Sequence, residues 1–315
     1  MSYATGIAIY NCGKFSNDKK KGDNAIIDCG NKDYLMIDCG PKDSAESYVK
    51  ALASKCKPKT SGAHNGKVYV KALVLSHNHK DHVEGLATLL ASDKLYIEKV
   101  YYTYPGSQYS NVVSALTGHS SETVGVGVCK TVTVNDTVLK IYDPSQAAYD
   151  AYDEEFSNYN SSQANNASMI CTITNTSTDN PYRALFLGDL NVAGLGYAID
   201  SWGTEVFFPA STISSLHYNF CKFGHHGQRS SANYQSNSNL GPTEINNYNT
   251  RIKANNYFMT VTKAHLVAAD SELTGTPNWD NYEYIEGLLS GNIRRYIRDT
   301  SDANYRVWYV YNNWN

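Results

Sequence analysis

One short segment, Ser-His77-Asn-His79-Lys-Asp81-His82, constrains this chain more than any other. It follows an apolar run that ends at Leu75 and precedes a helical pattern, so it lies at a predicted strand-to-helix turn. Alternation along a strand would place His77 and His79 on one side, and Asp81 and His82 at the start of the helix would turn toward a second ion nearby. Imidazole and carboxylate groups are ligands for zinc, manganese or iron. The segment therefore predicts a metal site.

Short apolar strands and amphipathic helices alternate along the chain, which predicts an α/β fold. The predicted strands cover 6–10, 25–28, 34–38, 67–75, 100–104, 130–134, 138–142, 168–173, 183–187, 220–223, 257–261, 294–298 and 305–311. The predicted helices cover 44–54, 83–91, 112–116, 191–201 and 282–289. No linker rich in Pro, Gly and Ser divides the chain, so we expect one domain over 1–315. Polar composition predicts surface insertions near 143–166 and 230–249.

Composition narrows the class of protein. Apolar residues make up 42% and charged residues 18%, which is typical of a globular chain. The net charge of −3 provides no general attraction for nucleic acid, so a polyanion would have to be held by a local patch or by metals. The odd number of cysteines, seven, without a Cys-x-x-Cys pair favours a reducing compartment. With no long apolar window and no signal-peptide pattern, we expect a cytoplasmic protein without membrane partners.

Two further segments could complete a two-metal site. Asp189 comes directly after an apolar strand and a glycine, Gly188, which lets the backbone approach closely while the carboxylate bridges two ions. His225 and His226 stand between glycines after another strand, where one imidazole could bind metal and its neighbour could contact substrate. His265, after a predicted strand, is a candidate substrate contact or a surface residue.

These motifs, taken in order, resemble those of the metallo-β-lactamase-fold hydrolases over most of the chain. The residues that carry the resemblance are His77-Asn-His79-Lys-Asp81-His82, Gly188-Asp189 and His225-His226-Gly227. The ComEC-like branch, whose hydrolase domain is attached to DNA-uptake channels, looks closer still. Its features are matched by Lys222-Phe-Gly-His225-His226-Gly227 with Ser230-Ser231, Asn166-Ala-Ser168, Gly22-Asp23 and Met36-Ile-Asp38-Cys-Gly40. Phosphorylcholine esterase modules are similar too.

The resemblance implies a four-layer α/β/β/α sandwich of two mixed sheets, with metals at one edge between the sheets. It implies two divalent ions, zinc in the first place and manganese as the alternative. His77 and His79 would hold one ion, Asp81 and His82 the other, and Asp189 would bridge them. The second ion would be completed by His226 or else by His225. Many members carry another histidine ligand before the Gly-Asp, but here that interval holds only His119, which comes too early and is expected to be a loop residue. We therefore expect the first ion to have few protein ligands.

The predicted chemistry is hydrolysis, with Asp81 and Asp189 as catalytic carboxylates, because two divalent ions lower the pKa of a bound water and neutralise charge on the substrate. Our first hypothesis is a phosphodiesterase acting on nucleic acid or nucleotides. The early-loop lysines Lys19, Lys20 and Lys21 would then offer phosphate-binding charge, unless they are merely solvated, and Ser230 is a further candidate contact. The second hypothesis is hydrolysis of a carbon ester, lactone or β-lactam, which would need an apolar cleft. The third is a metal-binding module without turnover.

Overall fold

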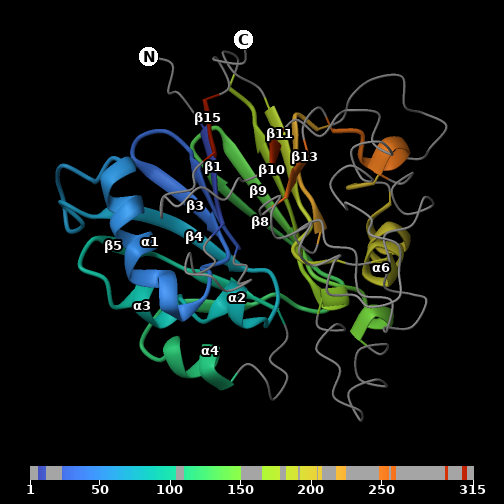
Figure 1. The fold of residues 1–315 in the computed structure, drawn as a ribbon, viewed down its shortest axis with the longest axis horizontal. Helices are drawn as coiled ribbons and strands as arrows, with labels where there is room; N and C mark the ends of the chain where they lie inside the picture. The colour runs from blue at the N-terminus through green and yellow to red at the C-terminus, as the bar shows by residue number, and fades with distance from the viewer. Residues whose placement is uncertain are drawn as a thin grey trace, which may run out of the picture.

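The computed structural model has two β-sheets stacked face to face, with helices on their outer sides (Figure 1). The structure describes residues 6–11, 23–103, 110–149, 165–177, 182–190, 192–203, 205–207, 218–224, 248–254, 257–259, 295–296 and 307–310. The helix expected at 282–289 and most of the two expected insertions lie outside these residues.

The first sheet consists mainly of strands from the N-terminal half of the chain. Its strands are β1 (Gly6–Asn11), β2 (Asp23–Asp28), β3 (Asp33–Ile37), β4 (Val68–Leu75), β5 (Leu95–Ile97), β6 (Val100–Tyr102), β7 (Ser121–Thr123) and β15 (Val307–Val310). Their order is β15-β1-β2-β3-β4-β6-β7, with β5 paired to β4. Antiparallel pairing joins β1, β2 and β3, whereas β3, β4, β6 and β7 pair in parallel. The sheet is therefore mixed.

The second sheet is also mixed. Its strands are β8 (Cys129–Val134), β9 (Thr137–Tyr142), β10 (Ile170–Asn175), β11 (Tyr182–Phe186), β12 (Phe220–Lys222), β13 (Tyr257–Met259) and β14 (Arg295–Tyr296). They follow one another in the order β14-β13-β12-β11-β10-β9-β8. β8 to β11 pair antiparallel, and β11 to β14 pair in parallel.

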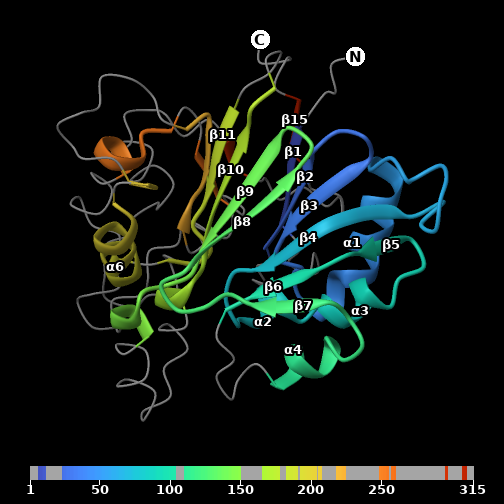
Figure 2. The same cartoon turned by 180° about the vertical axis from the view of Figure 1, so that it is seen from behind.

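Helices cover the outer face of each sheet, so the molecule has four layers. They are α1 (Lys42–Lys55), α2 (Lys80–Val83), α3 (Leu86–Leu90), α4 (Ser110–Ala115) and α6 (Val192–Trp202), with a π-helical turn over Tyr248–Ile252. α1 and α3 lie outside the first sheet and α6 lies outside the second, as the view from behind in Figure 2 also shows. This arrangement confirms the predicted α/β/β/α sandwich of two mixed sheets.

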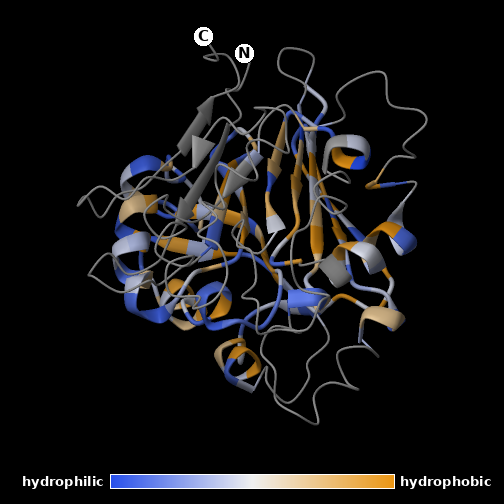
Figure 3. Ribbon diagram, turned by 45° about the vertical axis from the view of Figure 1, so that its right-hand side comes forward, coloured by the Kyte–Doolittle hydropathy of each residue, from blue (hydrophilic) through white to orange (hydrophobic). Residues whose placement is uncertain are grey.

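Alternating side chains along the strands fill the spaces between the layers. Leu35 and Ile37 of β3 face the second sheet, whereas Tyr34 and Met36, which alternate with them, pack against the helices. Apolar colour accordingly gathers on the strands of both sheets in Figure 3. The second sheet contributes to the central core the side chains of Leu139, Ile141, Cys171, Ile173, Ala184 and Phe186.

The helix predicted over 83–91 is interrupted, and the reason lies in one glycine. α2 ends at Val83 and α3 begins at Leu86. Between them, the Gly85 N–H donates to the carbonyl of Gly40 at 2.8 Å instead of to a carbonyl of its own helix. A Cβ at Gly85 would lie 2.2 Å from the Cys39 carbonyl oxygen. This close backbone contact holds the turn that carries His77 to His82 against the end of β3.

The short strands β5 and β7 were also not predicted from the sequence.

Candidate metal centre

The candidate site lies between the sheets, at an edge where strands from both sheets end. β3 and β4 are parallel, so Asp38 directly after β3 and Ser76 directly after β4 come together. The second sheet supplies Asp189, which follows β11 at the turn through Gly188. A backbone hydrogen bond of 2.8 Å from the Met169 N–H to the Ser76 carbonyl joins the two sheets at this edge.

Among the described residues, three groups of side chains could each hold a metal ion. One joins Asp23, Asp38 and His82, and the other two share Asp189. Of these two, one consists of His77, His79 and Asp189, and the other of Asp81, His82 and Asp189. Within each group the ligand atoms all lie within 4.8 Å of one another. The Oδ2 of Asp189 lies 3.8 Å from His77 Nε2 and 3.2 Å from His82 Nε2. The structure thus gathers these five side chains into two sets that share one carboxylate.

A bend in the chain, rather than strand alternation, brings His77 and His79 together. β4 ends at Leu75, and the chain bends at His77 and Asn78 before α2 begins. The ring centroids of His77 and His79 lie 4.6 Å apart, and those of His77 and His82 lie 4.2 Å apart. Our expectation of proximity was met, but its proposed cause, the pleat of a continuing strand, was wrong.

Asp38 and Ser76 orient the two buried imidazoles. Asp38 Oδ1 accepts from the Ser76 N–H at 2.7 Å, and its Oδ2 accepts from the Ser76 hydroxyl at 2.8 Å. Oδ2 also lies 2.8 Å from His82 Nδ1, which must carry the proton because a carboxylate only accepts. Since the Ser76 hydroxyl donates to Asp38, its oxygen accepts from His77 Nδ1 at 3.0 Å. Both imidazoles therefore turn Nε2 toward Asp189, and this is the nitrogen that each could offer to a metal ion.

Charge around these imidazoles suits a cation. Burial, together with the neighbouring His82 and His79, holds the pKa of His77 well below its usual range, so this imidazole is neutral. Burial also lowers the pKa of His82, but the carboxylates of Asp189 and Asp38 raise it by more, and it lies well above its usual range. The negative potential that favours a proton on His82 also favours a metal ion there.

The donor set fits a divalent metal. His77 is 1% exposed, and its Nε2 has no hydrogen-bond partner among the described residues. Burying a ring nitrogen without a hydrogen-bond partner costs free energy, unless a further group such as a metal ion binds it. The set combines neutral imidazole nitrogen with carboxylate oxygen, which suits zinc and its neighbours in the first transition row.

A tight turn presents Asp189 to this set. Gly188 has a φ of +54°, and a Cβ there would come within 2.7 Å of the Ser168 Cβ. The Asp189 N–H donates to the Ser168 hydroxyl at 3.0 Å. The close backbone approach expected at Gly188 is therefore present, and Ser168 is the residue that it approaches.

Several predicted site residues cannot be placed, since they lie outside the described residues. These are Lys19, Lys20, Lys21, His225, His226, Ser230 and His265. His119 is described, and it is an exposed loop residue after α4, as expected.

Sequence reasoning gave no role to three residues that contact the predicted ligands: Asp38, Ser76 and Lys222. Asp38 stood only within a segment of the resemblance, although a carboxylate directly after an apolar strand was a usable signal. Lys222 Nζ donates to the Gly188 carbonyl at 2.8 Å and lies 3.4 Å from Asp189 Oδ1. A lysine within the apolar run Phe-Cys-Lys-Phe was the signal for it.

A buried carboxylate away from the candidate ligands gives the protein a predictable pH dependence. Asp143 follows β9 directly, is 0% exposed, and its Oδ1 accepts from the Tyr149 hydroxyl at 2.7 Å. Burial raises the pKa of Asp143 to about 8, although hydrogen bonds from Tyr149 and Thr103 lower it in part. The folded protein therefore keeps this proton up to about pH 8, whereas the unfolded chain loses it near pH 4.

The contribution of Asp143 to stability is full below about pH 4 and falls as the pH rises to about 8. Asp143→Asn keeps an acceptor for Tyr149 and cannot ionise. We expect it to raise the free energy of unfolding by about 2–4 kcal/mol over the wild type at pH 8.5, and to change it little at pH 4.5. Urea unfolding at both pH values measures this difference. An equal effect of the substitution at both would contradict the expectation.

Comparison with solved structures decides the fold. The metallo-β-lactamase fold protein YhfI from Bacillus subtilis is similar with a TM-score of 0.52 and 11% identity, over 98% of this chain and 100% of that one. This chain has the metallo-β-lactamase fold. Unliganded yeast PDE1 is similar with a TM-score of 0.50 and 11% identity, over 92% of this chain and 93% of that one. No protein-family model matches the sequence, and a search of curated proteins finds no significant match.

At these identities the similarity establishes the metallo-β-lactamase fold and leaves its branch open. The resemblance to the ComEC-like branch therefore stays a prediction. None of the helices in the described part of the chain is both long and apolar enough to cross a membrane.

Proposed function

We propose that this protein is a hydrolase that uses two divalent metal ions, and that its substrate is a phosphodiester. The proposal that the protein uses two metal ions rests on the position of Asp189, whose Oδ2 faces both His77 and His82. One buried carboxylate common to two sets of ligands is the arrangement that holds a pair of ions close together.

The chain's own residues would divide the work as follows. His77 and His79 would hold one ion, Asp81 and His82 the other, and Asp189 both. When bound, the ions would supply an activated water at neutral pH and neutralise charge that develops on the substrate. Asp81 is half-buried, whereas Asp189 is 1% exposed. Asp81 is therefore the carboxylate better placed to accept a proton near solvent, while Asp189 joins the two sets of metal ligands.

The phosphodiester part of the proposal rests on charge. Two divalent ions would bring four positive charges and the four nearest carboxylates would offset them, so the Lys222 ammonium would leave a net charge of about +1 that the non-bridging oxygens of a phosphodiester could match. These carboxylates are those of Asp23, Asp38, Asp81 and Asp189. Lys19, Lys20 and Lys21 would add phosphate-binding charge. Zinc is the proposed ion and manganese the alternative. Nucleic acid or a nucleotide is the proposed substrate class.

A substrate panel tests this proposal. Bis-p-nitrophenyl phosphate, a lactone and a chromogenic cephalosporin are offered to the protein with zinc or manganese. We expect metal-dependent turnover of the phosphodiester, and turnover of the carbon substrates alone would reject the phosphodiesterase proposal.

Replacing Lys19, Lys20 and Lys21 with alanine should raise KM for the phosphodiester about tenfold while kcat changes little, because a loss of about 1.4 kcal/mol of binding free energy corresponds to a factor of ten.

The matched control is the triple alanine variant of Lys50, Lys55 and Lys57. These side chains are exposed on or just after α1, and the variant loses the same charge. α1 begins near the site edge and extends away from it, about 1.5 Å for each residue. We expect the control to retain the wild-type KM. An equal rise in both variants would mean that net charge alone acts, and would reject a role for the early loop.

A further inference from the structure

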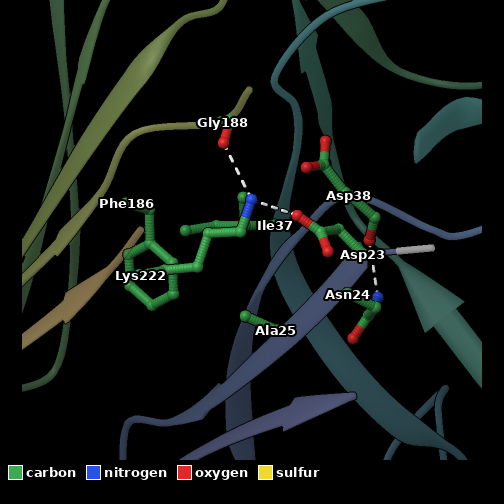
Figure 4. A pocket seen from close by; sticks show the side chains of 8 residues that line it. All are labelled: Asp23, Asn24, Ala25, Ile37, Asp38, Phe186, Gly188 and Lys222. Atoms are coloured by element: carbon green, nitrogen blue, oxygen red, sulfur yellow. Dashed lines mark hydrogen bonds and ion pairs between the residues drawn. The ribbon is translucent and has the colours of Figure 1, made fainter. Parts of the chain in front are cut away.

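Lys222 is a buried lysine in the second sheet that points toward the first. It is 4% exposed and ends the short strand β12. Its neighbours Cys221 and Phe223 belong to the apolar cluster on the helix side of the sheet, so alternation directs Lys222 the other way. Figure 4 shows its side chain extending toward Asp23 and the Gly188 carbonyl.

Within the described part of the chain the ammonium group has three partners, and two of them belong to the turn that carries Asp189. It donates to the Gly188 carbonyl at 2.8 Å and, more weakly, to Asp189 Oδ1 at 3.4 Å. It also forms an ion pair with Asp23, the first residue of β2 in the facing sheet. Asp23 and Asp189 are 3% and 1% exposed. The lysine therefore links the two sheets beside the candidate ligands.

The two oxygens of Asp189 have different neighbours. Oδ2 faces His77 Nε2 and His82 Nε2, whereas Oδ1 faces Lys222. Two buried carboxylates, those of Asp23 and Asp189, face the Lys222 amine, which therefore pairs with them as an ammonium. A charged donor on Oδ1 opposes rotation of the carboxylate, since rotation would break this charge-assisted hydrogen bond.

The space around Lys222 is too small for a substrate. The pocket that it lines with Asp23, Asn24, Asp38 and Gly188 has a volume of about 10 Å³, which is room for about one water molecule. Contact with substrate is therefore not the role of this lysine, and its effect must pass through the groups that it touches.

We propose that Lys222, held from the facing sheet by Asp23, is a positioning residue that fixes Asp189 so that Oδ2 alone faces both sets of metal ligands. This inference rests on the proposed function, because it assigns Asp189 to both ions. Residues of this kind, which orient a ligand from outside the coordination shell, typically change metal affinity or activity by about 10–100-fold when they are replaced.

The test measures metal binding apart from turnover. Lys222→Met removes the ammonium and keeps most of the side-chain volume, and Asp23→Asn removes its anchor while leaving the ammonium in place. Cys221→Ala is the matched control, because it opens a cavity next to Lys222 on the other face of β12. Zinc affinity is measured by competition with a chromogenic chelator, cobalt coordination by the visible spectrum, and folding by circular dichroism and urea unfolding.

We expect folded Lys222→Met to bind at least one ion about 10–100-fold more weakly and to show a changed cobalt spectrum. Asp23→Asn should fall between it and the wild type. Cys221→Ala should lose stability and retain wild-type affinity. Wild-type affinity and spectrum in folded Lys222→Met would overturn the positioning role, as would a loss of affinity in Cys221→Ala equal to that in Lys222→Met.

Three remaining outcomes are also decisive. If Lys222→Met does not fold, Asp23→Asn decides, and unchanged metal affinity in that variant would overturn the proposal. If the wild type binds no zinc or cobalt, the proposed function itself fails and the positioning role fails with it. If the wild type binds two ions and hydrolyses the phosphodiester while the variants match it, only the role of Lys222 fails.

Discussion

Asp189→Ala is expected to lower metal-dependent hydrolysis at least about a thousandfold, because two ions contribute several kcal/mol to the transition state and about 4 kcal/mol corresponds to that factor. The substitution removes the carboxylate common to both sets of ligands. It leaves Lys222 paired with Asp23, so the ammonium is not stranded and the fold should persist. Initial rates on bis-p-nitrophenyl phosphate, with metal content measured on the same samples, check both parts.

Asp200→Ala is the control for this expectation. Asp200 is an exposed carboxylate on α6, and its removal makes the same change in charge. We expect wild-type rates and wild-type metal content. Full activity in Asp189→Ala would show that no bridging carboxylate is needed. A loss of folding in that variant would show that Asp189 stabilises the core instead of binding metal.

Gly85→Ala is expected to destabilise the protein by about 3 kcal/mol or more, which is the upper end for an overpacked position. The added Cβ would lie 2.2 Å from the Cys39 carbonyl oxygen and 3.0 Å from that of Gly40, and backbone atoms of this kind cannot rotate away. The backbone of Gly85 is already helical, with a φ of −70°, so the effect is one of contact rather than of conformation. Urea unfolding measures it.

The same substitution should also weaken metal binding. The Cys39 N–H donates to the His82 carbonyl at 2.8 Å, so a shift of Cys39 would move His82 relative to Asp38. Gly196→Ala is the matched control, because nothing lies within 4 Å of its Cβ position and it stands inside α6. We expect that control to gain about 0.5–1 kcal/mol, as alanine does over glycine in a helix. A gain in stability in Gly85→Ala as well would contradict the close contact.

The sequence was sufficient to predict the fold class because its signals are local and repeated. Strands with alternating burial, such as β9, repeat their apolar residues with a period of two, and helices with one apolar face, such as α1, with a period of about 3.6 residues. The interruption at Gly85 was missed since the contact that causes it joins this glycine to Cys39 and Gly40, far away in the sequence. No periodicity records a contact of that kind.

The candidate ligands were predictable for a different reason. His77, His79, Asp81 and His82 are close in sequence, so a single turn brings them together, and among the described residues Asp189 joins them from the second sheet. The residues that orient them come from three further segments. Asp38 follows β3, Asp23 begins β2 and Lys222 ends β12. Asp38 meets His82 across a long interval of sequence, and the contact between Lys222 and Asp23 arises only after both sheets are assembled.

Anomalous diffraction from crystals soaked in zinc would test the two-metal site most directly. We expect two anomalous peaks for each chain at the edge between the sheets, one against His77 and His79 and the other against Asp81 and His82, with Asp189 touching both. One peak alone would contradict the shared carboxylate. Peaks elsewhere on the molecule, with none at this edge, would contradict the metal centre itself.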